Sequence, residues 1–231
     1  MEKIRNDVLV RRITRLCHFT PSNNLLHILT HERGIMPTYE VIIDGDIPYN
    51  PTDVNRYDQH TKYVCCSIQY PNVWFFEKAR LREELFEDWV VLFIKPFYLW
   101  RKGIKFCSVN ASTKRGYYIG EGFNAYSQLF INNPPGSRNT RSNKHLPFCP
   151  TDDQAEVLVF GNIELCDIMG IAVKDETQLK NELSRLKILK ESLKVDLRQI
   201  NFFIVPTFYD KFKLSNSIRR GILVEETKYE V

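Results

Sequence analysis

Short apolar runs separated by polar, turn-forming residues dominate this chain and predict a strand-rich fold. The run at residues 89–94, Trp-Val-Val-Leu-Phe-Ile, is apolar at every position. It is followed by Pro96, which cannot continue a hydrogen-bonded ladder. Similar runs recur along the chain. In all, we expect strands at residues 16–19, 63–68, 89–94, 104–109, 156–160, 168–173 and 201–205.

Helical periodicity appears between several of these strands. An apolar pattern at residues 25–29 predicts a helix that begins near Ser22, a suitable N-cap, and ends at Gly34, a suitable C′ residue. Two more helices are expected at residues 73–86 and 122–131, and a long polar loop is expected at residues 38–60. The residues after Asp210 give no clear signal.

The clearest helical period runs over residues 176–200, with charged residues between the apolar positions. We interpret it as a helix packed on its own sheet rather than a helix that binds a partner. Its apolar face carries Leu179, Leu183, Leu186, Leu193, Leu197 and Ile200.

Strands and helices in this order predict the mixed α+β class. The chain has 231 residues, of which 43% are hydrophobic and 13% aromatic, and this is enough for one well-packed core. Neither an internal repeat nor a low-complexity linker divides it. We therefore expect a single domain spanning residues 1–231.

Composition and charge narrow the class of protein only slightly. The formal charge of +4 does not by itself demand a nucleic-acid partner. No signal peptide is visible, and no apolar run approaches the roughly 20 residues of a membrane helix, so we expect a soluble, cytoplasmic protein with no membrane partner. Six cysteines without a CxxC pair argue against a disulfide framework and a zinc site. They are Cys17, Cys65, Cys66, Cys107, Cys149 and Cys166.

The segment most informative about function joins a basic loop to an apolar strand. Residues 132–150 combine Pro, Gly, Ser, Asn and basic side chains, which predicts a flexible loop. The loop leads into Thr-Asp-Asp-Gln-Ala-Glu-Val-Leu-Val at residues 151–159, which places Glu156 at the mouth of a strand. Such a carboxylate can be a rigidly held catalytic group, or the first polar residue of a strand that faces water. Because surface Glu is common, Glu156 alone favours the second interpretation.

No Gly-rich phosphate loop, HExxH, GxSxG or metal-ligand spacing occurs, so neither a Rossmann dehydrogenase nor a P-loop NTPase is expected. Polar residues lie instead at the predicted strand ends. Each has an ordinary structural explanation, such as a core histidine, a loop ion pair or a turn beside a proline. These residues are His18, Thr20, Asn55, Arg56, Tyr57, Asp58, Ser67, Asn72 and Glu156.

Taken together, these positions resemble the DarT family of DNA-targeting ADP-ribosyltransferase toxins. The resemblance covers about residues 16–173, and its most specific parts are His-Phe-Thr at residues 18–20 and Gln-Ala-Glu at residues 154–156. It implies the ADP-ribosyltransferase fold, with a split antiparallel or mixed β-sheet and flanking helices. It also implies NAD as co-substrate and no metal.

The resemblance implies roles for individual residues. Glu156 would stabilise the ribose as it turns cationic, and would take a proton from the attacking base. Arg56 would assist catalysis by pairing with the pyrophosphate of NAD or by steadying the nucleobase. Further contacts with NAD would come from His18, Thr20, Asn24 and Ser67.

The loop at residues 132–150 corresponds to the loop that selects the target in this family. Its basic side chains would contact DNA phosphates, and aromatic side chains would stack on the bases of single-stranded DNA. The residues expected to contact nucleic acid are Arg138, Arg141, Lys144 and Phe148, with Tyr117, Tyr118 and Trp74 as further stacking candidates.

One segment departs from the thymidine-modifying members of the family. They carry a motif like His-Asp-Tyr-Val-Pro-Phe-Tyr-Phe before a Pro-Met-Leu-Tyr turn, whereas residues 61–72 read Thr-Lys-Tyr-Val-Cys-Cys-Ser-Ile-Gln-Tyr-Pro-Asn. This region helps to build the base pocket. A different pocket selects a different base, so we slightly favour the branch that modifies guanosine.

The expected function is that of a toxin of a toxin–antitoxin system, with a role in phage defence, that attaches ADP-ribose to guanine or thymine of single-stranded DNA. Its partner would be an antitoxin that removes the adduct, a macrodomain or related ADP-ribosyl-DNA hydrolase. Three alternatives remain open at this point: transfer to RNA or protein, hydrolysis of NAD, and a non-enzymatic nucleic-acid-binding module. The last would use the basic loop with Arg11, Arg12 and Arg15.

Overall fold

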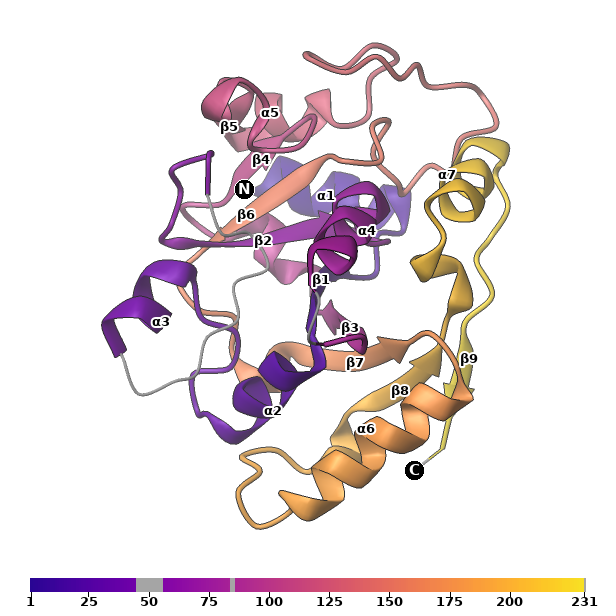
Figure 1. The fold of residues 1–231 in the computed structure, drawn as a ribbon. Helices are drawn as coiled ribbons and strands as arrows, with labels where there is room; N and C mark the ends of the chain where they lie inside the picture. The colour runs from indigo at the N-terminus through magenta and orange to yellow at the C-terminus, as the bar shows by residue number, and fades with distance from the viewer. Residues whose placement is uncertain (45–55, 84–85, 231) are drawn as a thin grey trace.

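The computed structural model describes residues 1–44, 56–83 and 86–230, and its framework is one nine-stranded β-sheet (Figure 1). The strands follow the order β5-β4-β6-β2-β1-β3-β7-β8-β9 across the sheet. Neighbouring strands are antiparallel except for β7 and β8, which makes the sheet mixed, as predicted. The strands are β1 (Leu16–Pro21), β2 (Tyr63–Ile68), β3 (Trp89–Ile94), β4 (Lys105–Cys107), β5 (Ile119–Glu121), β6 (Glu156–Phe160), β7 (Ile168–Val173), β8 (Asn201–Ile204) and β9 (Thr227–Tyr229).

The sheet divides between β1 and β2. Strand β1 pairs with β3 along its whole length, but it pairs with β2 only at Leu16 and Cys17. Strand β2 pairs on its other side with β6, from Tyr63 to Cys66. The two central strands therefore diverge beyond Cys17. Residues 18–21 of β1 and residues 63–66 of β2 are not paired with each other.

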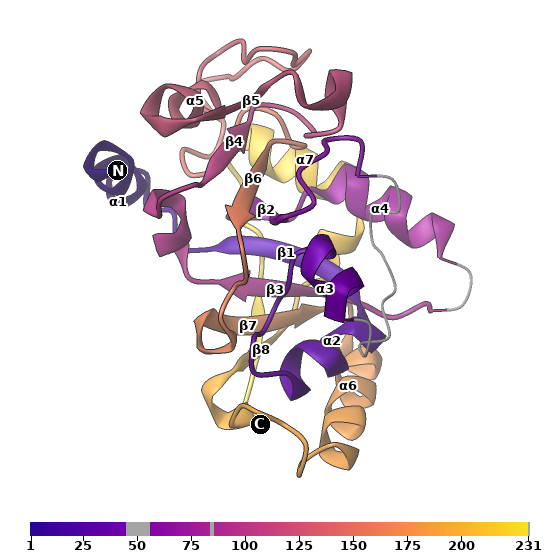
Figure 2. The same cartoon turned by 90° about the vertical axis from the view of Figure 1, so that its left-hand side faces the viewer.

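Helices cover both faces of the sheet, and Figure 2 shows α1 and α4 on opposite sides of it. The helices of the described residues are α1 (Glu2–Arg11), α2 (Ser22–Thr30), α3 (Thr38–Asp44), α4 (Val73–Arg82), α5 (Gly122–Gln128), α6 (Glu176–Ile188) and α7 (Lys211–Arg220). Judged over the same residues, no helix combines the length and apolar character needed to cross a membrane.

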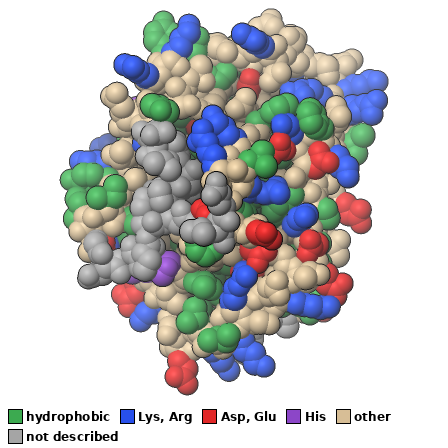
Figure 3. All heavy atoms as spheres, in the orientation of Figure 1, with side chains coloured by type: hydrophobic (Ala, Val, Ile, Leu, Met, Phe, Trp, Pro, Cys, Tyr) green, Lys and Arg blue, Asp and Glu red, His purple; other side chains and the backbone are tan. Residues whose placement is uncertain are grey.

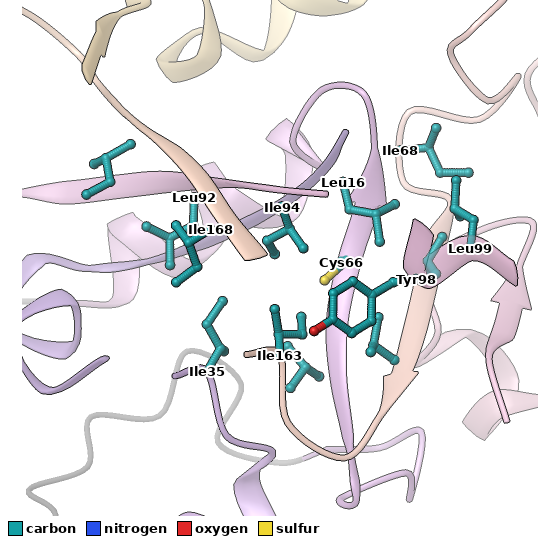
Figure 4. Packing of buried hydrophobic residues seen from close by; sticks show 14 of the residues in the cluster. Leu16, Ile35, Cys66, Ile68, Leu92, Ile94, Tyr98, Leu99, Ile163 and Ile168 are labelled. Carbon is teal, nitrogen blue, oxygen red and sulfur yellow. The ribbon is translucent and has the colours of Figure 1, made fainter. Parts of the chain in front are cut away.

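Two hydrophobic clusters lie on opposite faces of β3. Val90, Leu92 and Ile94 belong to the cluster that α1, α2, α5 and α6 cover, and Figure 4 shows part of this packing. Val91 and Phe93 alternate with them and belong to the cluster that α4 and α7 cover. Because both faces of β3 are buried, an apolar side chain is favoured at every position, which explains the uninterrupted apolar run.

All seven predicted strands are present. The bounds of β2, β3, β6 and β7 agree with the prediction, whereas β1 extends to Pro21 and β8 ends at Ile204. Strand β4 is shorter than predicted, because its ladder partners in β5 and β6 are opposite residues 105–107 only. Apolar runs thus locate the strands well, while pairing partners set their ends.

The start and end of α2 differ from the prediction. Pro21 occupies the N-cap position, and the hydroxyl of Ser22 donates to the buried carboxylate of Glu182 in α6 (2.5 Å) instead of capping the helix. The helix ends at Thr30, so Gly34 is not its C′ residue. Gly34 has a φ of 64° and lies against the backbone that follows β6, where a side chain would collide.

The predicted helix at residues 176–200 is wrong beyond Ile188, where α6 ends. The backbone N–H of Lys194 donates to the carbonyl of Leu29 in α2 (2.9 Å), so a tertiary bond replaces a helical one. Leu193 and Leu197 still pack against the core from the segment after α6, in which Leu197 begins a short 3₁₀ helix (Leu197–Gln199). Helices α4 and α5 are also shorter than predicted, although residues 84–85 lie outside the described part.

Five helices and strands give no clear signal in the sequence: α1, α3, β5, α7 and β9. Helix α3 occupies the start of the predicted loop at residues 38–60, of which residues 45–55 lie outside the described part. Helix α7 begins where the Asp210 carboxylate accepts from the N–H groups of Phe212 (3.1 Å) and Lys213 (3.0 Å), and it ends at Gly221. Its apolar contacts, Leu214 and Ile218, are four residues apart, a spacing too sparse to predict a helix.

Candidate active site

A cavity opens where β1 and β2 diverge. Its walls come from these two strands, from α2, from residues 34–41 and from residues 110–112 after β4. It encloses about 1200 Å³ including its open mouth. The six residues predicted for catalysis and NAD binding all line this cavity: His18, Thr20, Asn24, Arg56, Ser67 and Glu156.

Glu156 is the first residue of β6, and several N–H donors hold its carboxylate in place. The side-chain amides of Asn72 (3.0 Å) and Asn110 (2.9 Å) donate to Oε1, and the backbone N–H of Ala111 donates to Oε2 (3.0 Å). Only 6% of the residue is exposed. The interpretation of Glu156 as a strand residue facing water is therefore wrong, and it is a buried, oriented carboxylate on the wall of a cavity.

His18 of β1 reaches across the split in the sheet. Its Nδ1 lies 2.8 Å from the carbonyl oxygen of Cys65 in β2. Because a carbonyl can only accept, Nδ1 carries the proton, and Nε2 of the neutral ring is left as an acceptor. Burial, and secondarily the positive charge of Arg56, lowers the pKa of His18 below its usual value, which favours this neutral form.

The other small polar residues of the cavity are held by one another. The Asn24 amide donates to the Thr20 hydroxyl (3.0 Å), which joins the first turn of α2 to the end of β1. The Ser67 hydroxyl accepts from the backbone N–H of Asn72 (3.1 Å) and donates to the Cys17 carbonyl (3.4 Å). Ser67 thereby positions the backbone of Asn72, whose side chain holds Glu156.

Arg56 is buried in the cavity wall and is committed to protein acceptors. Its guanidinium forms a bidentate ion pair with Asp58, with both distances 2.9 Å. It also donates to the Tyr63 carbonyl (3.1 Å), the His60 carbonyl and the Thr38 hydroxyl (3.3 Å). This geometry favours a role in holding the wall of the cavity over the predicted free pairing with pyrophosphate.

The predicted DNA-contacting residues divide into two groups. Arg138 and Lys144 are exposed. Arg141 instead donates to the carbonyls of Leu146 (2.9 Å) and Cys149 (2.9 Å), and Phe148 is half-buried against the hydrophobic core. Arg141 and Phe148 thus build the loop, and their placement does not favour the predicted direct contacts with DNA.

The loop at residues 132–150 is also tied to its surroundings more firmly than its composition predicts. The Asp152 carboxylate accepts from Ser137 and Asn139 of the loop, and from the backbone N–H of Gln154 (2.8 Å). Burial raises the pKa of Asp152. Small polar residues that suggest flexibility in the sequence here provide the side-chain hydrogen bonds that close the loop.

The buried His145 of this loop should make stability depend on pH. Its Nε2–H donates to the Pro150 carbonyl (3.0 Å), and burial, followed by the charge of Arg141, lowers its pKa to about 4. Because the unfolded chain takes up this proton near pH 6.5, stability is full above pH 6.5 and is lost as pH falls toward 4, by on the order of 3 kcal/mol. Urea unfolding at pH 7, 5.5 and 4 measures this loss.

The matched variant for this prediction is His145→Gln, which keeps a donor but does not titrate. Other titrating groups are common to both proteins, so the difference between their pH profiles isolates His145. We expect the variant to lose less stability between pH 6.5 and 4. Parallel profiles would contradict a buried, neutral imidazole.

Sequence reasoning missed two residues of the site or gave them no role. The sequence marks Asn72 only as a polar residue at a strand end and does not single out Asn110, yet both amides bind Glu156. The one signal in the sequence that could have pointed to Asn110 is its position directly after Val109, the last residue of the predicted strand at residues 104–109. Strand pairing places Asn110 near Glu156, because Cys107 of β4 is opposite Glu156 of β6.

All six cysteines are free in the structure. Burial raises the pKa of the Cys17 and Cys107 thiols to about 12, which makes them unreactive. Within residues 1–44, 56–83 and 86–230, no group of three or more His, Cys, Asp or Glu side chains could hold a metal ion.

Known proteins provide an independent comparison. The chain matches the family described as "DarT: ssDNA thymidine ADP-ribosyltransferase, DarT" over residues 17–204. Its fold resembles that of Thermosipho africanus DarTG in complex with ADP-ribose, with a TM-score of 0.57 and 16% identity over 85% of this chain. That match covers 51% of DarTG, so the chain spans about half of that protein's length. Among curated proteins, no match was found.

Two further structures are of Thermus sp. 2.9 DarT, each matched over 97% of its length. The complex with ADP-ribosylated ssDNA has a TM-score of 0.56 and 13% identity over 86% of this chain. The complex with NAD+ has a TM-score of 0.56 and 16% identity over 85% of this chain.

The split mixed sheet has the α+β, ADP-ribosyltransferase-like fold of these DarT structures. Because the family match extends over most of the sequence, the chain belongs to the DarT family of NAD-dependent ADP-ribosyltransferases.

Proposed function

We propose that this chain transfers ADP-ribose from NAD to a nucleobase of single-stranded DNA. The proposal depends chiefly on one observation: Glu156, held by three N–H donors, and the neutral ring of His18 line the same cavity in the split sheet. A fixed carboxylate and a fixed acceptor suit a ribose that becomes cationic while its hydroxyl groups donate hydrogen bonds.

The proposed reaction breaks the bond between ribose C1′ and the nicotinamide nitrogen. Nicotinamide leaves with the bonding electrons and becomes neutral, so its departure needs no acid. A nitrogen of the nucleobase then forms the new bond to C1′ and loses a proton, which the Glu156 carboxylate accepts. The rigid support of Glu156 keeps the carboxylate beside the developing charge at little cost in reorganisation.

The remaining cavity residues fit NAD as a substrate. Nε2 of His18 can accept from a ribose hydroxyl, and the Thr20–Asn24 pair offers further polar groups on the same wall. Ser67 acts through Asn72, and Arg56 holds the wall through its ion pair with Asp58. The exposed Arg138 and Lys144 would contact DNA phosphates.

We propose guanine as the modified base, because residues 61–72 differ from the motif of thymidine-modifying members and line the cavity around Cys65, Cys66 and Ser67. The test incubates the protein with labelled NAD and oligonucleotides of single-base composition. Label on guanine-containing DNA supports both parts of the proposal. Label on thymine-containing DNA supports transfer to DNA but rejects the base. Nicotinamide release without transfer indicates NAD hydrolysis, and transfer to RNA or protein indicates another acceptor.

We further propose that the chain is a toxin countered by an ADP-ribosyl-DNA hydrolase, such as a macrodomain antitoxin. Bulky adducts on DNA bases block replication, so expression in bacteria without such an enzyme should stop growth. Co-expression of an ADP-ribosyl-DNA hydrolase should restore it, and the Glu156→Gln variant should not inhibit growth. Normal growth of cells that contain active protein and no hydrolase would contradict this role.

A further inference from the structure

A second cavity adjoins the first, and Asn110 lines both. Its walls come from Trp74 of α4, from Arg138 and Asn139 of the loop, and from residues 152–154 before β6. Arg219 of α7 completes it. Helix α7 lies beyond residue 204, where the match to the DarT family ends, so this wall belongs to a part of the chain that the family match does not describe.

A buried carboxylate holds Arg219 at this cavity. Oδ2 of Asp153 accepts from the Arg219 guanidinium (2.6 Å) and from the Trp74 indole N–H (3.3 Å), and the same indole N–H approaches the Ser215 hydroxyl of α7 (3.0 Å). The Asp153 side chain is 2% exposed, and its Oδ1 has no hydrogen-bond partner among the described residues. The Arg219 side chain is 37% exposed, so a buried anion orients a cation that solvent can reach.

The end of α7 is also fixed against the loop at residues 132–150. The backbone N–H of Leu146 donates to the Ile218 carbonyl (3.0 Å). Gly221 has a φ of 72°, and a Cβ there would stand 2.5 Å from the Lys144 carbonyl oxygen, so only glycine permits this close approach. The position of Arg219 is therefore set by the same loop that carries Arg138 and Lys144.

The hydrogen-bond donors and residue types at this cavity fit a nucleotide, because its two carboxylates, Asp152 and Asp153, are already bonded to protein donors. Lys and Arg side chains gather at the upper right of the face in Figure 3, over the position that α7 occupies in Figure 1. Two guanidinium groups offer donors for a phosphate, the amide of Asn139 can bond a base, and the half-buried indole of Trp74 offers an apolar surface. This combination is characteristic of sites for single-stranded nucleic acid.

We propose that the second cavity binds a nucleotide of single-stranded DNA next to the target base, and that Arg219 contacts its phosphate. The inference rests on the proposed function, since it places the flanking nucleotide beside the base that enters the first cavity. Helix α7 then contributes to the DNA-binding surface, and Asp153 is the positioning residue that holds Arg219 toward the strand.

The test measures binding of a fluorescent single-stranded oligonucleotide by anisotropy over a series of salt concentrations. Arg219→Ala should raise Kd about tenfold at low salt and reduce the slope of log K against log salt by about 0.7, the value for one lost phosphate contact on a single strand. The matched control, Arg220→Ala, changes an exposed residue of the same helix outside the cavity and should alter Kd less than twofold.

Arg138→Ala, in the part of the wall formed by the loop, provides a second variant if Arg219→Ala proves unstable, because Arg138 is exposed. It should likewise weaken binding. Unchanged Kd in the folded variants, or wild-type protein that does not bind single-stranded DNA, would overturn the inference. Failure of the wild type to cleave NAD would speak against the proposed function instead, since DNA binding is measured without NAD.

Discussion

Exchange of Glu156 for glutamine should lower the rate of ADP-ribose transfer by about 10²–10⁴-fold while the protein remains folded. Glutamine keeps the length of the side chain and one oxygen that can accept from Asn72 and Asn110. It removes the negative charge and the proton acceptor, which are the two properties that the proposed reaction requires. The measurement is the initial rate of label transfer from NAD to single-stranded DNA at saturating substrate.

The matched control is Glu164→Gln, which makes the same exchange at an exposed residue after β6. It should keep wild-type activity. Thermal unfolding of both variants separates lost chemistry from lost structure. Transfer within a few-fold of wild type in a folded Glu156→Gln protein would contradict the role of this carboxylate.

Glu156→Ala is a less informative variant than the sequence alone indicates. A carboxylate at a strand mouth is expected to be exposed, and its removal to be harmless. Because Glu156 is buried, alanine leaves the amides of Asn72 and Asn110 and the N–H of Ala111 without this acceptor. Each unsatisfied buried donor costs about 1–3 kcal/mol. Loss of activity in this variant would therefore mix two causes.

Removal of the Arg56 side chain should destabilise the protein by about 3–5 kcal/mol, because it leaves the Asp58 carboxylate buried without its ion-pair partner. The guanidinium also donates to the carbonyls of His60 and Tyr63, which hold the cavity wall together. Urea unfolding of Arg56→Ala measures the loss. A change below about 1 kcal/mol would mean that the pair does not hold this wall.

Asp58→Asn separates the two roles considered for Arg56. It keeps the guanidinium and its charge but weakens the pair that orients it. If Arg56 acts by holding the wall, Asp58→Asn should raise the KM for NAD by about as much as Arg56→Lys does. If Arg56 pairs directly with pyrophosphate, Arg56→Lys should raise KM while Asp58→Asn leaves it near the wild-type value.

The sequence predicts an element best where burial requires an apolar side chain at every position of that element. β3 is buried on both faces, so its apolar run alone located it. Helix α7 could not be found in this way, because only Leu214 and Ile218 face the core. Asp210 at its N-cap and Gly221 at its C-terminus are typical helix ends, but they predict a helix only when a periodic apolar pattern lies between them.

The candidate site was predictable in part for a similar reason. His18 and Glu156 lie at the ends of recognisable strands and within short motifs of a known family. Asn110 gains its role only because strand pairing brings β4 beside β6, which a single sequence does not reveal. Likewise, the sequence identifies Arg56 and Arg141 as positively charged. Only the fold shows that their guanidinium groups already donate to oxygen atoms of the protein.

The most direct measurement is a crystal structure with bound NAD. The nicotinamide ribose should lie in the cavity between β1 and β2, with a hydroxyl group bonded to the Glu156 carboxylate and the imidazole of His18 within hydrogen-bond distance of the dinucleotide. NAD bound elsewhere, or bound with its nicotinamide ribose remote from Glu156, would contradict the assignment of this cavity as the active site.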